Sequence, residues 1–205
     1  MNKTRKIHSA IGLEANYIAS IVDEETLYKI FLEVNGYSDS EESRQKLEFM
    51  KNTNRAEISR MISSYTGSLS NHIRTKKAHN KIPLIFRSEL AKKIAGISPV
   101  TTFEANYIAV GNGTLAVSDS DLLLDNEYVR GLIDQRTTVD HIAYLDKFFT
   151  SWEIGGTTMT EVGTFCDGTA TLETGTLLSR VLLNENFGAT ETLTLNVTIS
   201  FTSAN

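Results

Sequence analysis

The segment Thr192-Leu-Thr-Leu-Asn-Val-Thr-Ile-Ser-Phe-Thr202 decides the fold, because its polar and apolar side chains alternate without a break. A period of two is typical of a β-strand that buries one face and exposes the other. The threonines favour the same conformation, since a branched Cβ packs well on a pleated surface. We therefore predict a long strand here, and we expect it to be an edge that pairs with a neighbouring molecule.

Shorter segments of the same kind precede this strand. Turn signals such as Gly111-Asn112-Gly113 and Asp167-Gly168 separate them. About six or seven short strands spaced in this way predict an antiparallel β-sandwich. The earlier predicted strands are residues 103–110, one strand within 129–143, then 144–154, 158–166 and 177–183.

The first half of the chain follows a helical period instead. Apolar residues recur at helical spacing in residues 23–35, where Asp23 can cap the helix and Gly36 can end it. Further helices are predicted to begin at Asp39 and at Asn54, and to cover residues 88–95. The predicted fold class is therefore α+β, with a mainly helical attachment region over residues 1–98 and an antiparallel β-sandwich over residues 99–205.

Charge and composition change at the same boundary. Before Pro99 there are 16 Lys+Arg and 11 Asp+Glu, a net charge of +5. From Pro99 onward there are 4 Lys+Arg and 14 Asp+Glu, a net charge of -10. The overall charge of -5 therefore hides a basic half and an acidic half. Opposite charges on two regions could attract neighbouring subunits in a fixed register.

Composition also excludes several classes of protein. One cysteine in 205 residues excludes an intramolecular disulfide framework and a cysteine-rich zinc site. No segment has the apolar run of a membrane span or of a secretory signal, so we expect no contact with a membrane. The four histidines are far apart and lack metal-ligand spacing.

No motif in the chain predicts an active site. Cys166 lacks a nominated base and is expected to be a small buried residue. Asp140 and His141 lie in a predicted strand, so their side chains should point to opposite faces. Residues 119–125 are acidic but do not fit a helix–loop–helix calcium site, which leaves an irregular calcium site as the alternative. We therefore expect a non-enzymatic protein without a cofactor or a bound metal.

A basic stretch between residues 74 and 93 is the strongest candidate for a contact surface. A solvated surface without a partner is the commoner explanation of such a cluster, and contact with nucleic acid or an acidic protein is the functional one. Nucleic acid is less favoured, because no aromatic side chains interleave with the cations. The residues predicted to contact a partner are Arg74, Lys76, Lys77, Lys81 and Arg87.

A repeated hexapeptide and the position of Trp152 are two further features of the sequence. The hexapeptide at residues 14–19, Glu-Ala-Asn-Tyr-Ile-Ala, recurs at residues 104–109. Its flanks do not match, so we treat it as a coincidence, with a segment that mimics a strand as the alternative. Trp152 lies at the end of a predicted strand and is expected in the core.

A series of motifs follows one another in the second half of the chain. They are Tyr107-Ile-Ala-Val-Gly-Asn-Gly-Thr114, Ser118-Asp-Ser-Asp-Leu122, Asn126-Glu-Tyr-Val-Arg130, Thr160-Glu-Val-Gly-Thr-Phe165, Gly175-Thr-Leu-Leu-Ser-Arg180 and the final strand. In this order they resemble small structural proteins from the tail, neck and fibre-attachment regions of tailed bacteriophages. The resemblance covers roughly residues 103–202.

This resemblance implies a structural component of the virion, in the neck, collar or tail, made in the cytoplasm of the bacterial host. The implied partners are copies of the chain itself and other virion proteins such as portal, tail or capsid. The alternative is a β-sandwich binding module that recognises a host-surface carbohydrate or protein through the loops at residues 111–126 and 167–175.

Overall fold

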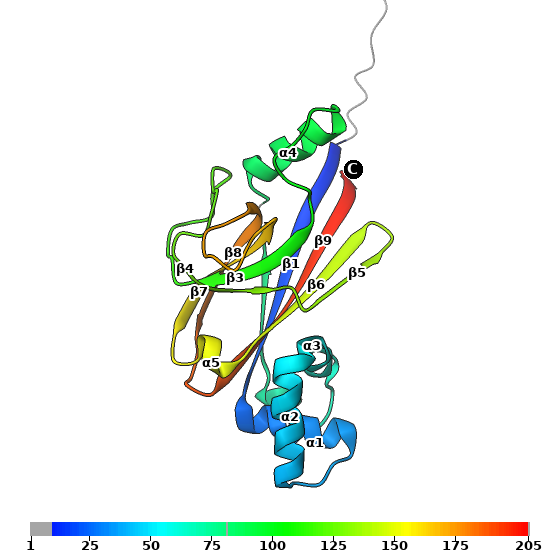
Figure 1. Cartoon of the computed structure of the whole chain (residues 1–205), viewed down its shortest axis with the longest axis vertical. Helices are drawn as coiled ribbons and strands as arrows, with labels where there is room; N and C mark the ends of the chain where they lie inside the picture. Colours follow the sequence, from blue (N-terminus) through cyan, green and yellow to red (C-terminus); the bar gives the residue numbers. More distant parts are fainter. Residues whose placement is uncertain (1–9, 81, 205) are drawn as a thin grey trace, which may run out of the picture.

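Two antiparallel β-sheets and five α-helices make up the computed structural model, which describes residues 10–80 and 82–204 (Figure 1). The predicted α+β class is confirmed. Sheet A has the strand order β2-β1-β9-β6-β5, and sheet B has the order β4-β3-β7-β8. The elements are β1 Ala10–Asp23, α1 Glu24–Asn35, α2 Glu41–Thr53, α3 Arg55–Ser64, a 3₁₀ turn Ser70–His72, β2 Arg74–His79, α4 Leu84–Ile94, β3 Ala105–Gly111, β4 Glu127–Leu132, β5 Gln135–Val139, β6 Ile142–Phe149, α5 Ser151–Ile154, β7 Thr158–Cys166, β8 Thr176–Asn186 and β9 Glu191–Ala204.

Strand β9 contains the alternating segment and lies in the middle of sheet A. It pairs with β1 from Asp23↔Glu191 to Ala10↔Ala204, and with β6 on its other side. Its apolar side chains from Leu193 to Ile199 are buried between the sheets, as the alternation predicts. The expectation of an edge strand is wrong, because two segments of the same chain occupy both sides of β9.

The structure does not separate the chain at Pro99. Strands β1 and β2 come from the first half, yet they belong to the same sheet as β9. Both copies of the repeated hexapeptide lie mainly on strands, the first in β1 of sheet A and the second in β3 of sheet B. Strand-like character is therefore what the two copies share.

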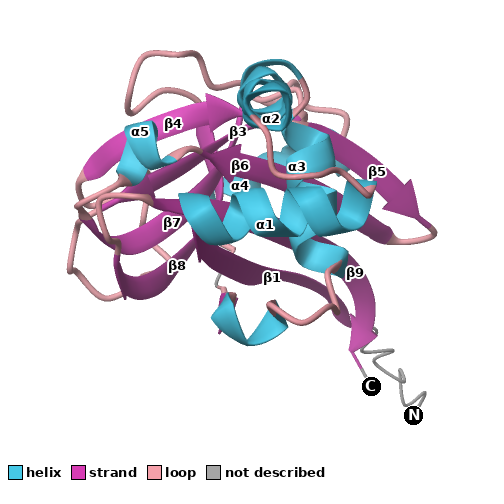
Figure 2. Ribbon diagram, turned by 90° about the horizontal axis from the view of Figure 1, so that it is seen from below, coloured by secondary structure: helices cyan, strands magenta, loops and turns pink. Residues whose placement is uncertain are grey.

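Helices α1, α2 and α3 gather at one end of the molecule, and α4 lies at the other end (Figure 1). Figure 2 looks at the molecule from the end that carries α1–α3. Helix α1 begins as predicted, with the backbone N–H of Thr26 donating to Asp23 at 2.9 Å, and it ends at Gly36 with a left-handed φ of 65°. Helix α2 is capped by Ser40 rather than Asp39. Helix α4 begins at Leu84, before the predicted start at residue 88.

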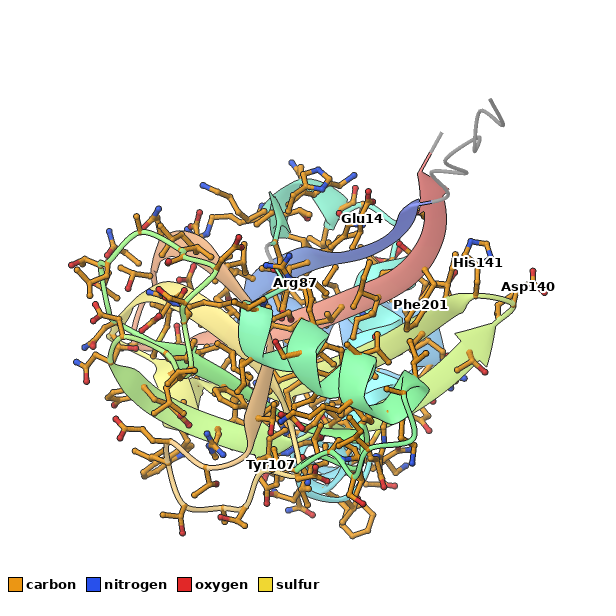
Figure 3. All side chains as sticks on the ribbon, turned by 90° about the horizontal axis from the view of Figure 1, so that it is seen from above. Glu14, Arg87, Tyr107, Asp140, His141 and Phe201 are labelled. Atoms are coloured by element: carbon orange, nitrogen blue, oxygen red, sulfur yellow. The ribbon has the colours of Figure 1, made fainter. Side chains whose placement is uncertain are left out.

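Three apolar clusters stabilise the described part of the chain, and the smallest packs Leu124 against Phe165 and Leu177 of sheet B. The largest cluster lies between the sheets, and the second packs α1, α2 and α3 against Val22 and Phe148 of sheet A. Asp140 and His141 lie at the turn between β5 and β6 rather than inside a strand (Figure 3). No helix in the described part of the chain is long and apolar enough to cross a membrane.

Candidate functional site

Strand β2 carries most of the predicted contact residues, and acidic side chains of the same chain neutralise two of them. Arg74 contacts Glu185 at 3.2 Å and Glu191 at 2.8 Å, while Lys76 contacts Glu185 at 3.2 Å. Lys76 pairs in register with Ala19, which is buried on the inner face of sheet A. Its side chain therefore lies on the side of β2 that meets sheet B.

Lys77 and Arg87 do not form one patch with these two. Lys77 lies on the outer side of β2 and is exposed, and no carboxylate among the described residues is within ion-pair distance of it. Arg87 belongs to α4, at the opposite end from α1–α3, and contacts Asp119 at 3.3 Å (Figure 3). Lys81 lies outside the described residues. Ion pairs between the two halves therefore neutralise part of the charge difference inside the molecule.

Charged residues of the motifs at residues 160–165 and 175–180 form a buried network that fixes the loop at residues 111–126. Glu161 on β7 and Arg180 on β8 are both buried, with 2.8 Å between the Glu161 carboxylate and Arg180 Nε. Glu161 also accepts backbone hydrogen bonds from Gly113, Asp125 and Asn126. The pair therefore anchors a loop and offers no open acid–base site.

A second buried pair fixes the loop at residues 167–175 in the same way. Arg130 donates two hydrogen bonds to Glu127, at 2.5 and 2.7 Å. Arg130 also donates to the backbone oxygen of Thr174 at 2.9 Å, and Glu127 accepts from the backbone N–H of Glu173 at 3.0 Å. Both loops predicted to recognise a ligand are thus tied to sheet B by buried ions.

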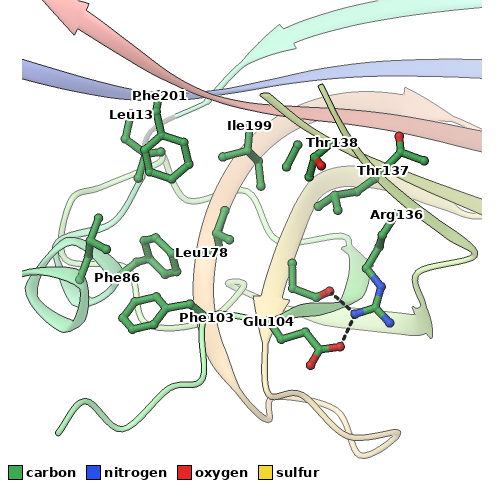
Figure 4. A pocket seen from close by; sticks show the side chains of 14 residues that line it. Leu13, Phe86, Phe103, Glu104, Arg136, Thr137, Thr138, Leu178, Ile199 and Phe201 are labelled. Carbon is green, nitrogen blue, oxygen red and sulfur yellow. Dashed lines mark hydrogen bonds and ion pairs between the residues drawn. The ribbon is translucent and has the colours of Figure 1, made fainter. Parts of the chain in front are cut away.

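A cavity of about 420 Å³ opens between the sheets at the end covered by α4 (Figure 4). Strands of both sheets and α4 contribute to its walls, so residues far apart in the sequence meet there. Buried apolar side chains form the floor, and exposed polar side chains lie at one end of the rim. The lining residues are Leu13, Phe86, Leu90, Phe103, Glu104, Ala105, Arg136, Thr137, Thr138, Ala143, Leu145, Leu178, Ile199 and Phe201.

Asp167 holds one wall of this cavity in place. Its carboxylate accepts hydrogen bonds from the Thr101 hydroxyl and the Thr102 backbone, each at 2.7 Å, and from the Thr102 hydroxyl. Partial burial raises the pKa of Asp167, but these hydrogen bonds outweigh burial and hold the pKa below its ordinary value. Phe103, the next residue, has a φ of 67°, which a bulky side chain adopts only when its surroundings impose it.

The Phe103 ring packs edge-on against Phe86 of α4, with the ring centroids 5.4 Å apart. Farther along the rim, Arg136 of β5 donates to Glu104 at 2.5 Å and to the backbone oxygen of Ala105 at 3.2 Å. Figure 4 shows the aromatic pair and this ion pair at separate places around the cavity. The cavity therefore has an apolar interior and a polar rim. Sequence reasoning missed it, because no local motif marks a site assembled from so many segments.

A second hollow lies beside Trp152, whose side chain is 97% exposed. The expectation that Trp152 is in the core is wrong: it is the second residue of the short helix α5, and its neighbour Ile154 is the residue that packs inward. The hollow measures about 320 Å³ and also includes Lys51, Asn52 and Arg55. An exposed indole beside polar side chains is a surface suited to recognition.

Groups that could carry covalent or metal chemistry are scarce in the described residues. Residues 10–80 and 82–204 contain no cluster of three or more side chains arranged to hold a metal ion. Burial raises the pKa of the Cys166 thiol to about 12, so it is not a reactive nucleophile. Burial also raises the pKa of Tyr17 to about 12, and its hydroxyl is hydrogen-bonded to Thr164 and Ser179.

Comparison with known proteins gives no relative from which a function could be transferred. No family model matches the chain, and neither a curated protein nor a solved structure matches it.

Proposed function

We propose that the chain is a non-enzymatic structural component of a tailed-bacteriophage virion, in the neck, collar or tail. In this proposal it assembles with copies of itself and joins other virion proteins such as portal, tail or capsid. One observation carries the proposal. The phage-like motifs, taken in order, supply all four strands of sheet B, the loop between β3 and β4, and the central strand β9 of sheet A.

The physical role of the motif charges supports the same proposal. Glu161 of one motif pairs with Arg180 of another, and Glu127 pairs with Arg130 within a third. Both pairs are buried and tie loops to sheet B, so the motif charges act as scaffold in this chain. A scaffold role for the motif charges supports a structural function.

Sheet A offers surfaces through which copies could join. Strands β2 and β5 are its edges and lie on opposite sides of the sheet. On β5, the side chains from Arg136 to Val139 are exposed. Pairing of β2 in one copy with β5 in the next would be a head-to-tail contact, and such contacts close into rings when the rotation per copy allows it.

Native mass spectrometry of the purified protein, together with mass spectrometry of purified virions, tests this proposal. We expect an oligomer, and we expect Thr138→Lys on β5 or Lys77→Glu on β2 to reduce the number of subunits. Lys93→Glu is the control, since it makes the same change of charge at an exposed position on α4. A strictly monomeric protein that is absent from virions would contradict the proposal.

The ion pairs on β2 and α4 also bear on nucleic acid as a partner. Arg74, Lys76 and Arg87 already contact carboxylates of the same chain, so they are less available to phosphates. We therefore keep proteins as the proposed partners. Binding of DNA with an affinity that falls steeply as salt increases would reverse this preference.

Recognition of a host-surface carbohydrate is the second candidate function, and the exposure of Trp152 is the observation that favours it. The hollow beside the indole is also lined by Asn52, whose amide can bind sugar hydroxyls, and by Lys51 and Arg55, which already contact carboxylates of the same chain. Trp152 is the only tryptophan in the chain, so its fluorescence reports directly on this surface. A glycan array with wild type and Trp152→Ala tests this function, and no signal for wild type would exclude it.

A further inference from the structure

The interior of the cavity between the sheets is lined by apolar side chains from several strands. Leu145, Leu178 and Ile199 are each less than 10% exposed and come from β6, β8 and β9. On another side, Phe103 is held against Phe86 by a segment that Asp167 fixes. Pockets that bind small molecules are mostly apolar and largely pre-formed, with volumes of about 300–1,000 Å³.

Polar groups are concentrated at one part of the rim. Arg136 uses only Nη1 in its contacts with Glu104 and the backbone of Ala105. In the described part of the chain, Nε and Nη2 of Arg136 donate no hydrogen bond. The Arg136 and Glu104 side chains are 46% and 66% exposed, and exposed ion pairs are held weakly. A carboxylate from solution could therefore bind the free edge of the guanidinium or replace Glu104.

We propose that this cavity binds a medium-chain alkyl carboxylate, with its chain among the buried apolar side chains and its carboxylate on Arg136. The proposal goes beyond the virion role and does not depend on it. Arg136 is the one cation among the described lining residues and lies at the rim beside Glu104, while the interior is apolar, which fits a ligand with one anionic end and one long apolar part. A sugar would leave its hydroxyls unpaired against Phe86, Leu178 and Ile199.

Calorimetric titration of the full chain with octanoate, decanoate, dodecanoate and decanol tests the two parts of the proposal. Each added methylene group should tighten binding about fourfold until the cavity is full. Arg136→Gln should weaken decanoate about tenfold while leaving decanol unchanged. Arg60→Gln is the matched control, because Arg60 is also an exposed arginine that contacts a glutamate, and it should change neither affinity.

A second variant tests the location. Ala143 lines the cavity, so Ala143→Leu should fill part of it and weaken every ligand, whereas Ala170→Leu in an exposed loop should not. If Ala143→Leu does not fold, the methyl NMR signals of Leu178 and Ile199 in the wild type give the same information, since decanoate should shift them.

Several results would overturn the proposal. They are the absence of binding for all chain lengths, equal affinity of wild type for decanoate and decanol, and unchanged affinity in folded Ala143→Leu. Dissociation of a wild-type dimer by decanoate, with no ligand retained on the monomer, would place a second copy over the cavity and would also overturn it. Loss of virion assembly leaves these outcomes unaffected, so the two proposals can fail separately.

Discussion

Replacing Glu161 with glutamine should destabilise the protein strongly, although the two side chains have nearly the same shape. The Glu161 side chain is buried, and its two oxygens accept from the backbone N–H groups of Gly113, Asp125 and Asn126 and from Arg180. An amide has one acceptor oxygen, and its NH₂ group would face donors. Glu161→Gln therefore removes the charge and reverses part of the hydrogen bonding without creating a cavity.

The expected loss of stability depends on the partners that buried Arg180 keeps after the substitution. Arg180 would keep Asp121 at 2.8 Å and the backbone oxygen of Leu115 at 2.9 Å, but it would lose its partner at Nε. Breaking a buried ion pair from one side costs about 3–5 kcal/mol. The total stability of a domain is about 5–15 kcal/mol, so this change would be a large share of it. A double variant with Arg180→Met should lose less than the sum of the single variants, by about 0.5–3 kcal/mol.

Urea denaturation at neutral pH measures these free energies, and hydrogen exchange of residues 111–126 shows whether the loop opens first. Glu57→Gln is the control, since Glu57 is in an exposed pair with Arg60 and should contribute at most about 1 kcal/mol. A loss below about 1 kcal/mol for Glu161→Gln, or strict additivity in the double variant, would refute the role assigned to this network.

Three further predictions concern other buried or hydrogen-bonded groups. The folded state lowers the pKa of Asp167, so the ionised carboxylate stabilises the fold at a pH above its ordinary pKa of 3.8. The stability advantage of wild type over Asp167→Asn should disappear as the pH falls through the lower pKa of the folded state. Acid titrations followed by circular dichroism measure this difference. Tyr17→Phe should cost about 1–3 kcal/mol in thermal or urea denaturation, because it leaves the buried hydroxyls of Thr164 and Ser179 without this partner. Cys166 should react with a thiol reagent only after unfolding, and rapid labelling of the native protein would contradict its burial.

The sequence allowed β9 to be predicted but not β1, and the difference lies in what covers their outer faces. In β1, Tyr17, Ala19 and Ile21 are buried between the sheets and follow a period of two. Val22 is also buried, because α1–α3 pack on the outer face at that end. An apolar residue on each face hides the alternation, so the pattern did not indicate a strand.

Strand β2 could not be predicted from its own residues. The segment Arg74-Thr-Lys-Lys-Ala-His79 has one small apolar side chain and no alternation. It forms a strand because β1 offers a free edge and because Glu185 and Glu191 attract Arg74 and Lys76. Its structure therefore comes from tertiary contacts, which local propensity does not contain.

The cavity could not be predicted from the sequence for the same reason, because tertiary contacts assemble it. Phe103 could be assigned to the start of a strand, but its left-handed backbone depends on hydrogen bonds from neighbouring threonines to Asp167, more than 60 residues away. Arg136 could be recognised as an isolated cation in an acidic half, but its contact with Glu104 depends on how the two sheets face each other. The sequence therefore contains the individual residues of the cavity but does not show that they lie close together.

The ion pairs between the two halves change what the charge difference implies for assembly. Arg55, Arg74 and Arg87 from the first half contact Glu153, Glu185 and Asp119 from the second. Because these charges stabilise one folded unit, they add little long-range attraction toward another copy. An interface between copies must therefore depend on groups left free by folding, such as the edges of sheet A, Lys77 and Trp152. For this reason, single changes at these positions test assembly more cleanly than reversal of the whole basic stretch.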